Sequence, residues 1–170
     1  MNANMTDSSS GLSEEELSRT CRVLDIIRGT TVDGPGFRTS IYLAGCPHHC
    51  PGCHNPQSWD AGGGREISIR ELLEIVKEEE FDVTLSGGDP LMHPDTTALL
   101  AKGISLMGHK VWVYTGYTIE EIRRTPALHP PLQWVEAIVD GPFIESLKDP
   151  DLLFRGSANQ RIITKDRFFL

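Results

Sequence analysis

Apolar residues follow two spacings along this chain, and together they predict strands that alternate with helices. Short, nearly continuous apolar runs are typical of buried strands. We expect such strands at residues 23–27, 39–44, 82–85, 111–114, 134–139 and 161–164. Between these runs, apolar residues spaced three or four apart are typical of amphipathic helices. We expect a short helix ending near Thr20 and three more, from Ser68 through Glu79, from Pro94 to Gly108 and from Thr118 through Arg124.

Polar residues at the helix starts support this division, because Ser13, Ser68 and Thr118 are each followed three residues later by a glutamate, as in a capping box. Strand, helix and strand in succession predict a parallel sheet with crossover helices. A full barrel of eight such units needs ~250 residues, and this chain offers about five to six units. We therefore expect an α/β fold, an open incomplete (β/α) barrel with outer helices. A doubly wound sheet is the alternative, and either fold binds ligands at the carboxyl ends of its strands.

The length of 170 residues predicts one domain. We assign residues 21–170 to it and residues 1–20 to a polar N-terminal extension with a short helix. Apolar runs are all much shorter than the ~18 residues of a membrane span, and residues 1–10 lack the apolar centre of a secretion signal. The expected location is cytoplasmic, without membrane contact.

Acidic residues outnumber basic ones by 24 to 16, which gives a net charge of −8. Two stretches, residues 1–20 and 66–82, account for the whole surplus. We interpret them as a solvated tail and a solvated helix face. Since binding to nucleic acid requires clustered lysine and arginine, this balance disfavours nucleic acid as a main partner.

Three of the four cysteines, Cys46, Cys50 and Cys53, lie within eight residues of one another, directly after the strand expected at residues 39–44. Such close spacing in a chain without a secretion signal indicates metal ligation or redox chemistry rather than a disulfide framework. Three thiolates can hold three corners of an iron–sulfur cubane, which leaves the fourth iron open to a substrate or cofactor.

Zinc is the alternative metal for this loop, held by the three cysteines and a neighbouring histidine, His48, His49 or His54. The fourth cysteine, Cys21, stands alone in the sequence. We interpret it as a small buried residue at the edge of a strand.

A glycine turn, Ser86-Gly87-Gly88-Asp89-Pro90, ends the strand expected at residues 82–85. Its two glycines tolerate positive φ and let another molecule approach the backbone. Strand-end carbonyls and the carboxylate of Asp89 suit the ammonium group of a ligand, which can only donate hydrogen bonds. Alone this segment is a plain β-turn, but it follows the cysteine loop by one strand–helix unit, and the pair of motifs is specific.

The pair resembles the two signature motifs of the radical S-adenosylmethionine superfamily. Four further segments resemble the glycyl-radical-enzyme activating proteins. Within that group, the resemblance is to the proteins that activate anaerobic ribonucleoside-triphosphate reductases. These segments are Val-Asp-Gly-Pro-Gly-Phe-Arg at 32–38, Val-Tyr-Thr-Gly-Tyr at 113–117, Val-Asp-Gly at 139–141 and Phe-Arg-Gly-Ser-Ala-Asn-Gln at 154–160. The resemblance runs from about Cys21 to Ile163, nearly the whole chain.

The resemblance implies a [4Fe-4S] cluster held by Cys46, Cys50 and Cys53, whose fourth iron binds S-adenosyl-L-methionine. It also implies that three residues of the glycine turn hold the methionine amino group, namely Gly87, Gly88 and Asp89. Many superfamily members carry an aromatic residue where Gly52 stands. The adenine is therefore expected against the backbone around Gly52, Cys53 and His54, or against a group elsewhere.

The chemistry implied by the resemblance begins with a low-potential one-electron donor such as flavodoxin, which reduces the cluster. Cleavage of S-adenosylmethionine then yields a 5′-deoxyadenosyl radical, which takes a hydrogen atom from a glycine of the reductase. No side-chain acid or base is required, because the cofactor supplies the chemistry. Two alternatives stay open from the sequence: an activase of another glycyl radical enzyme, of the formate-lyase type, and a non-catalytic zinc-stabilised α/β binding module.

Overall fold

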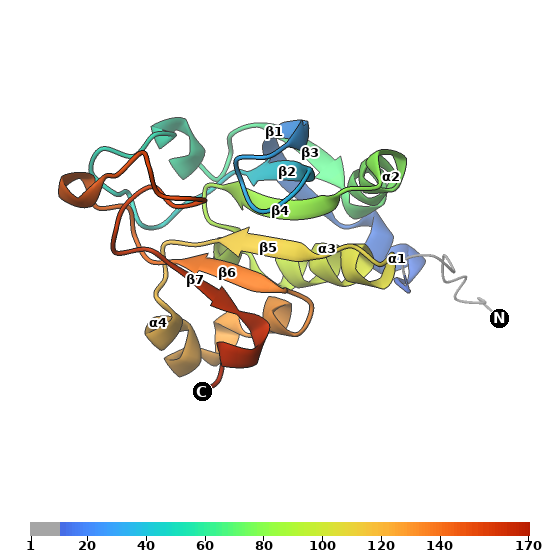
Figure 1. The fold of residues 1–170 in the computed structure, drawn as a ribbon. Helices are drawn as coiled ribbons and strands as arrows, with labels where there is room; N and C mark the ends of the chain where they lie inside the picture. Colours follow the sequence, from blue (N-terminus) through green and yellow to red (C-terminus); the bar gives the residue numbers. More distant parts are fainter. Residues whose placement is uncertain (1–10) are drawn as a thin grey trace.

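A single seven-stranded sheet, with strand order β3-β1-β2-β4-β5-β6-β7, organises the chain (Figure 1). The structure, a computed structural model, describes residues 11–170, so residues 1–10 of the expected polar N-terminal extension lie outside the described residues. The strands are β1 Thr20–Thr30, β2 Arg38–Leu43, β3 Arg65–Ser68, β4 Asp82–Gly87, β5 Val111–Tyr114, β6 Ala137–Asp140 and β7 Arg161–Thr164. The helices are α1 Glu14–Ser18, α2 Ile69–Glu79, α3 Pro94–Leu106 and α4 Ile119–Arg124.

The sheet is mixed, and the prediction of a parallel sheet holds for its centre alone. Strands β2, β4, β5 and β6 are parallel neighbours, joined by three helical crossovers rather than the expected five or six units. Strands β1, β3 and β7 pair antiparallel at the two edges. The turn at residues 31–37 is too short for a crossover, and a short connection makes β1 and β2 an antiparallel hairpin.

Two local predictions are wrong in detail. Strand β3 was not expected, because it begins with the charged residues Arg65 and Glu66 instead of an apolar run. Strand β6 begins at Ala137 rather than at residue 134. The residues before it form a 3-10 turn, Pro130–Gln133, that ends with a hydrogen bond from the Trp134 N–H to the Pro131 carbonyl. Proline lacks the N–H that a strand ladder requires.

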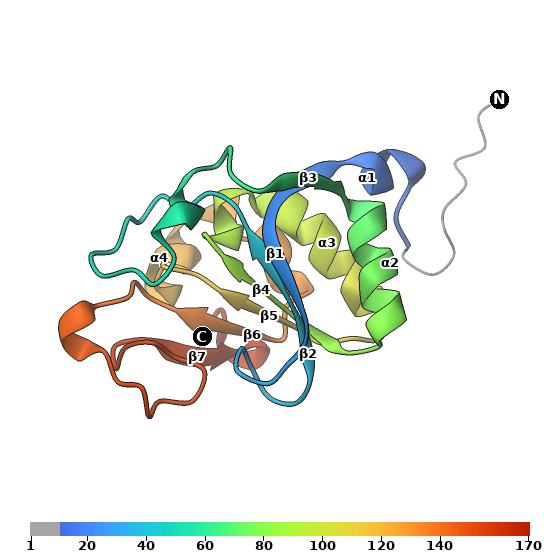
Figure 2. The same cartoon turned by 90° about the horizontal axis from the view of Figure 1, so that it is seen from above.

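The two faces of the sheet differ in polarity, and the helices cover one of them (Figure 2). The helix-covered face contributes Ile41, Leu85 and Val113 to the main core, together with apolar residues of all four helices. Because side chains alternate along a strand, the neighbouring residues point to the other face. That face presents polar and aromatic groups: Arg38, Tyr42, Thr84, Ser86, Trp112 and Tyr114. It is the polar face that has room for a ligand.

Helix starts follow the predicted capping. Complete capping boxes form at Ser13 for α1 and at Thr118 for α4. At α2 the Ser68 hydroxyl accepts a hydrogen bond from the Glu71 N–H, whereas the Glu71 carboxylate lies 3.7 Å from Arg65. Within residues 11–170, no helix is long and apolar enough to cross a membrane.

Candidate metal centre

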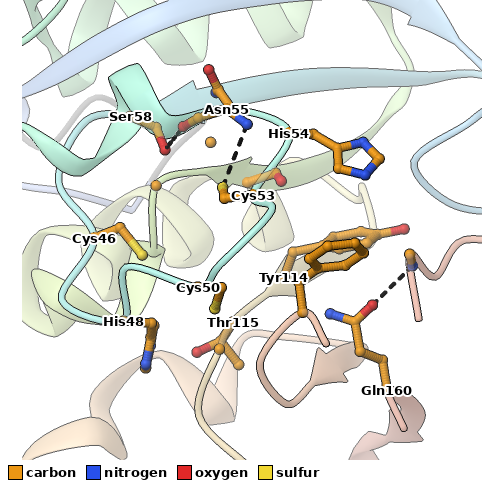
Figure 3. Close-up of a pocket in the computed structure, with 16 residues that line it drawn as sticks. Cys46, His48, Cys50, Cys53, His54, Asn55, Ser58, Tyr114, Thr115 and Gln160 are labelled. Atoms are coloured by element: carbon orange, nitrogen blue, oxygen red, sulfur yellow. Dashed lines mark hydrogen bonds between the residues drawn. The ribbon is translucent and has the colours of Figure 1, made fainter. Parts of the chain in front are cut away.

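The cysteine loop and the glycine turn meet at the carboxyl ends of the parallel strands. Both line one cavity of about 250 Å³, together with residues that follow β5 and the β6–β7 loop (Figure 3). The lining consists of Cys46, His48, Cys50, Cys53, His54, Asn55, Ser58, Ser86, Gly87, Gly88, Tyr114, Thr115, Gly116, Phe143, Gly156 and Gln160. The three thiols therefore share one cavity with two of the three predicted residues of the glycine turn.

Backbone hydrogen bonds shape the start and end of the cysteine loop. The N–H of Gly45, which has a φ of 98°, donates to the Ser58 carbonyl at 2.8 Å. The N–H of Cys46 donates to the Trp59 carbonyl at 3.3 Å, and that of Cys53 to the Cys50 carbonyl at 3.1 Å. The loop is thus closed on itself by main-chain bonds, with its thiols toward the cavity (Figure 3).

The glycine turn is bonded directly to the loop. The Gly88 N–H donates to the Leu43 carbonyl at 2.7 Å, and the Asp89 N–H donates to the Gly45 carbonyl at 2.8 Å. A Cβ added at Gly87 would overlap the backbone of Leu43, and one added at Gly88 would overlap the Gly45 carbonyl. The chain's own backbone therefore requires glycine at both positions, a reason that differs from the expected approach of a ligand.

Three other residues were predicted to contact S-adenosylmethionine, and they lie in different surroundings. His54 lines the cavity and packs edge-on against Phe143, with ring centroids 5.1 Å apart. Gly52 is exposed, and a Cβ there would press on the carboxylate of Glu145. The Asp89 side chain is 1% exposed and accepts hydrogen bonds from His48, Thr115 and the backbone of Leu91 and Gly116. It faces these groups instead of the cavity.

Comparison with known proteins places this arrangement in a family. Residues 32–163 match the family model described as "4Fe-4S single cluster domain". The anaerobic ribonucleoside-triphosphate reductase-activating protein of Escherichia coli strain K12 is 36% identical over 76% of this chain and 89% of its own length. The proteins of the same name from Pasteurella multocida and Enterobacteria phage T4 are 35% and 32% identical over 77% of this chain, and over 89% and 86% of their own lengths.

The chain belongs to this family of activating proteins. Among solved structures, QueE from Escherichia coli is similar over 58% of this chain and 54% of its own, with 19% identity and a TM-score of 0.45.

The cysteines fit the cluster of the activating-protein family. Cys46, Cys50 and Cys53 are free thiols on one loop, and all three line the cavity. Sulfur ligands on a short loop are the ordinary donor set for iron–sulfur clusters. Within residues 11–170, no three His, Cys, Asp or Glu side chains form a group that could hold a metal ion.

The fourth cysteine, Cys21, lies in the sheet rather than in the cavity, and burial raises the pKa of a thiol in both places. Burial raises the pKa of the Cys46 thiol, with the Asp89 carboxylate adding to the effect and backbone N–H groups of the loop opposing it. Cys21 lies opposite Ile67 in the β1–β3 ladder, and burial raises the pKa of its thiol to about 11. Its side chain is half-buried, as those of the three loop cysteines are, and packs against the main apolar core.

Several residues of the cavity were not predicted as site residues. Tyr114 ends β5, Thr115 and Gly116 follow it, and Phe143 follows β6. The first three lie in the segment at 113–117 that was quoted for the resemblance. The rule that ligands gather at the carboxyl ends of parallel strands applies to all four. The predicted ends of the strands were therefore the sequence feature that could have identified these cavity residues.

Two further motifs of the activating proteins form supports around the cavity. The loop at residues 31–37 is held by Arg38, which donates to Pro35, Val83 and Thr84 and is 1% exposed. In the segment at 154–160, the Gln160 amide bonds the backbone of Gly141, Gly156 and Ser157. Both motifs use their polar groups within the chain.

Proposed function

We propose that this protein activates an anaerobic ribonucleoside-triphosphate reductase by creating a glycyl radical on it, using a [4Fe-4S] cluster and S-adenosylmethionine. The observation that supports this proposal is the shared cavity, in which three thiols of one loop stand beside a glycine turn that is hydrogen-bonded to that loop. Relatives that match over three quarters of the chain are named as activating proteins of anaerobic ribonucleoside-triphosphate reductase.

In this proposal Cys46, Cys50 and Cys53 hold the cluster, and one iron is left without a protein ligand. Gly87 and Gly88 provide the backbone of the methionine site, and Asp89 belongs to the same turn. Gly52, Cys53 and His54 provide the adenine site. Bound together and given one electron, the cluster and S-adenosylmethionine would supply a 5′-deoxyadenosyl radical, with methionine as the other product, for removal of a hydrogen atom from a glycine Cα of the reductase.

The chain's own residues orient these groups and keep water from them. His54 and Phe143 wall one side of the cavity, while Tyr114 stands between it and an outer hollow bounded by Val32, Leu152 and Arg155. We propose that the polar face of the sheet is the inside of an open, incomplete barrel, and that the glycine-bearing loop of the reductase enters through this outer hollow. A low-potential one-electron donor such as flavodoxin would supply the electron needed for the chemistry from the exposed side of the cysteine loop, in the cytoplasm.

The test is anaerobic incubation of the reconstituted protein with S-adenosylmethionine, a reductant and its reductase, followed by electron paramagnetic resonance. We expect the doublet of a glycyl radical on the reductase and one 5′-deoxyadenosine for each radical formed. Cys46→Ala, Cys50→Ala and Cys53→Ala should each abolish the signal and lower the iron content, while Cys21→Ala should keep both. Wild-type protein with a full cluster and no glycyl radical, or iron lost from Cys21→Ala alone, would contradict the proposal.

A further inference from the structure

The carboxylate of Asp89 accepts four hydrogen bonds inside the protein. Its Oδ1 accepts a hydrogen bond from the Leu91 N–H at 2.9 Å. Its Oδ2 is the meeting point of three donors: the Thr115 hydroxyl at 2.9 Å, the Gly116 N–H at 3.0 Å and His48 Nε2 at 2.6 Å. A carboxylate oxygen offers about two lone-pair sites. Three donors therefore leave Oδ2 without capacity for the ammonium group of a ligand.

His48 comes from the middle of the cysteine loop, between the first two thiols. Its side chain is 17% exposed and lies edge-on to Tyr117, with ring centroids 4.5 Å apart. A Cβ on Gly116 would overlap the His48 ring, so the ring packs directly on that backbone. One face of the imidazole is thus held by packing while its Nε2 is held by Asp89.

This contact attaches residues 47–50 to the end of the sheet. Pro47 and His49 are exposed, and the His49 ring stacks on Trp59 with ring centroids 4.6 Å apart. Among residues 11–170, the hydrogen bond from His48 to Asp89 is the one that joins residues 47–50 to the glycine turn. The backbone bonds described above hold the loop at Gly45, Cys46 and Cys53. The hydrogen bond from His48 and the backbone bond from the Cys53 N–H to the Cys50 carbonyl together position Cys50 relative to the glycine turn.

We infer that Asp89 is a positioning residue, which acts through His48 to fix the cysteine loop against the Gly87–Gly88 backbone. Thr115 and Gly116 extend the same bond network to the end of β5, so that three strand ends are tied at one carboxylate oxygen. Satisfied buried networks of this kind hold a site in one geometry. The inference rests on the proposed function, because it supposes that loop and turn bind one ligand together.

The experiment compares the affinity of cluster-containing variants for S-adenosylmethionine, measured from the change it causes in the spectrum of the reduced cluster. Asp89→Asn keeps an acceptor for Leu91 but places an amide opposite three donors. His48→Leu removes the donor, and His48→Gln keeps an N–H at a similar reach. The double variant, His48→Leu with Asp89→Asn, measures the coupling of the two residues.

We expect Asp89→Asn and His48→Leu each to weaken binding about tenfold or more, with the iron content unchanged. The double variant should bind S-adenosylmethionine no more weakly than whichever single variant binds it less tightly, because both changes break the same hydrogen bond between His48 and Asp89. His48→Gln should bind within about threefold of wild type. A role in stability alone would lower the melting temperature without this pattern of affinities.

His49→Asn is the matched control, since His49 lies in the same loop at a φ of 47°, which asparagine tolerates, and its ring stacks on Trp59 instead of bonding the glycine turn. It should bind S-adenosylmethionine within about threefold of wild type. Losses that multiply in the double variant would show that Asp89 contacts the ligand independently, and would overturn the inference while leaving the proposed function intact.

If Asp89→Asn fails to fold, the two His48 variants are sufficient to test the inference. Equal affinity of His48→Leu and His48→Gln overturns the inference, and a tenfold difference supports it. Wild-type protein that carries a full cluster and does not bind S-adenosylmethionine overturns the proposed function and this inference together.

Discussion

Glycine at the turn after β4 is required by contacts inside the chain. A side chain at Gly87 or Gly88 would meet the backbone of β2 and of the cysteine loop, which pass within hydrogen-bond distance. Gly87 also has a φ of 100°, a region that side chains rarely adopt. At the scale of single residues, the close approach of two strand ends thus explains why a turn that lines the cavity lacks side chains.

We predict that Gly88→Ala displaces the cysteine loop through the Gly45 carbonyl. The free energy of unfolding should fall by ~1–3 kcal/mol, as for other overpacked sites, and the iron content after reconstitution should fall with it. Urea unfolding and iron analysis measure the two effects. Gly62→Ala is the control, because the nearest atom to an added Cβ there is a side-chain oxygen of Asp60 at 3.3 Å. Equal stability of the two variants would contradict the prediction.

The last strand and helix are joined at one buried carboxylate. Asp140, at the end of β6, is fully buried and accepts a hydrogen bond from the Ile119 N–H at the start of α4. It also accepts two from the Arg161 guanidinium, and Arg161 reaches on to Glu120 at 2.7 Å. At the scale of elements, the Val-Asp-Gly motif therefore ties β6, β7 and α4 together.

The hydrogen bond from Arg161 lowers the pKa of the Glu120 carboxyl from 4.5 to about 2. A folded-state pKa below the unfolded value stabilises the fold above pH 4.5 and loses that contribution as the pH falls through about 2. We predict that Glu120→Gln lowers the free energy of unfolding near neutral pH by at most about 1 kcal/mol, since the pair is half-exposed.

The difference between wild type and Glu120→Gln should shrink between pH 4.5 and about 2. Urea unfolding of the cluster-free protein across this range measures it. Glu136→Gln offers a comparison, because Glu136 is an exposed glutamate beyond the reach of this network. A difference that stays constant down to the lowest pH would show that the ion pair contributes no pH-dependent stability.

The whole molecule has a helix-covered core and an opposite polar face that holds the cavity. The N-terminal segment belongs to the core side: Leu12 and Leu17 are 0% and 1% exposed and pack in the main apolar cluster. Helix α1 lies beside α2 there, away from the cysteine loop (Figure 2). Stability and ligand binding therefore depend on different faces of the sheet.

We predict that Leu17→Ala lowers the free energy of unfolding by ~2–5 kcal/mol, the usual range for a fully buried leucine. Iron content and affinity for S-adenosylmethionine should stay at wild-type values in the folded protein. Leu106→Ala, at a leucine that is 49% exposed, should change stability by less than about 1 kcal/mol. A loss of cluster in Leu17→Ala at temperatures where the protein is folded would contradict this separation of faces.

Local features of this protein were predictable without coordinates. Strands β5 and β7 have the predicted bounds, and the starts of α1, α2 and α4 follow their capping residues. The cysteine loop and the glycine turn were expected to meet at the carboxyl ends of neighbouring strands, and they do. Periodicity, capping and turn chemistry all act over a few residues, so a short stretch of sequence suffices to reveal them.

The pairing of the edge strands and the contacts between residues far apart in the sequence were revealed by the tertiary structure alone. The antiparallel edges of the sheet, the overlap that requires Gly88 and the orientation of Asp89 depend on contacts between distant segments. Asp89 meets His48 across 41 positions and Thr115 across 26. A carboxylate beside a glycine turn suits a ligand or a protein donor equally well in sequence. In the folded chain the Asp89 carboxylate accepts four hydrogen bonds from protein donors, and three of these donors come from segments that only the fold brings to it.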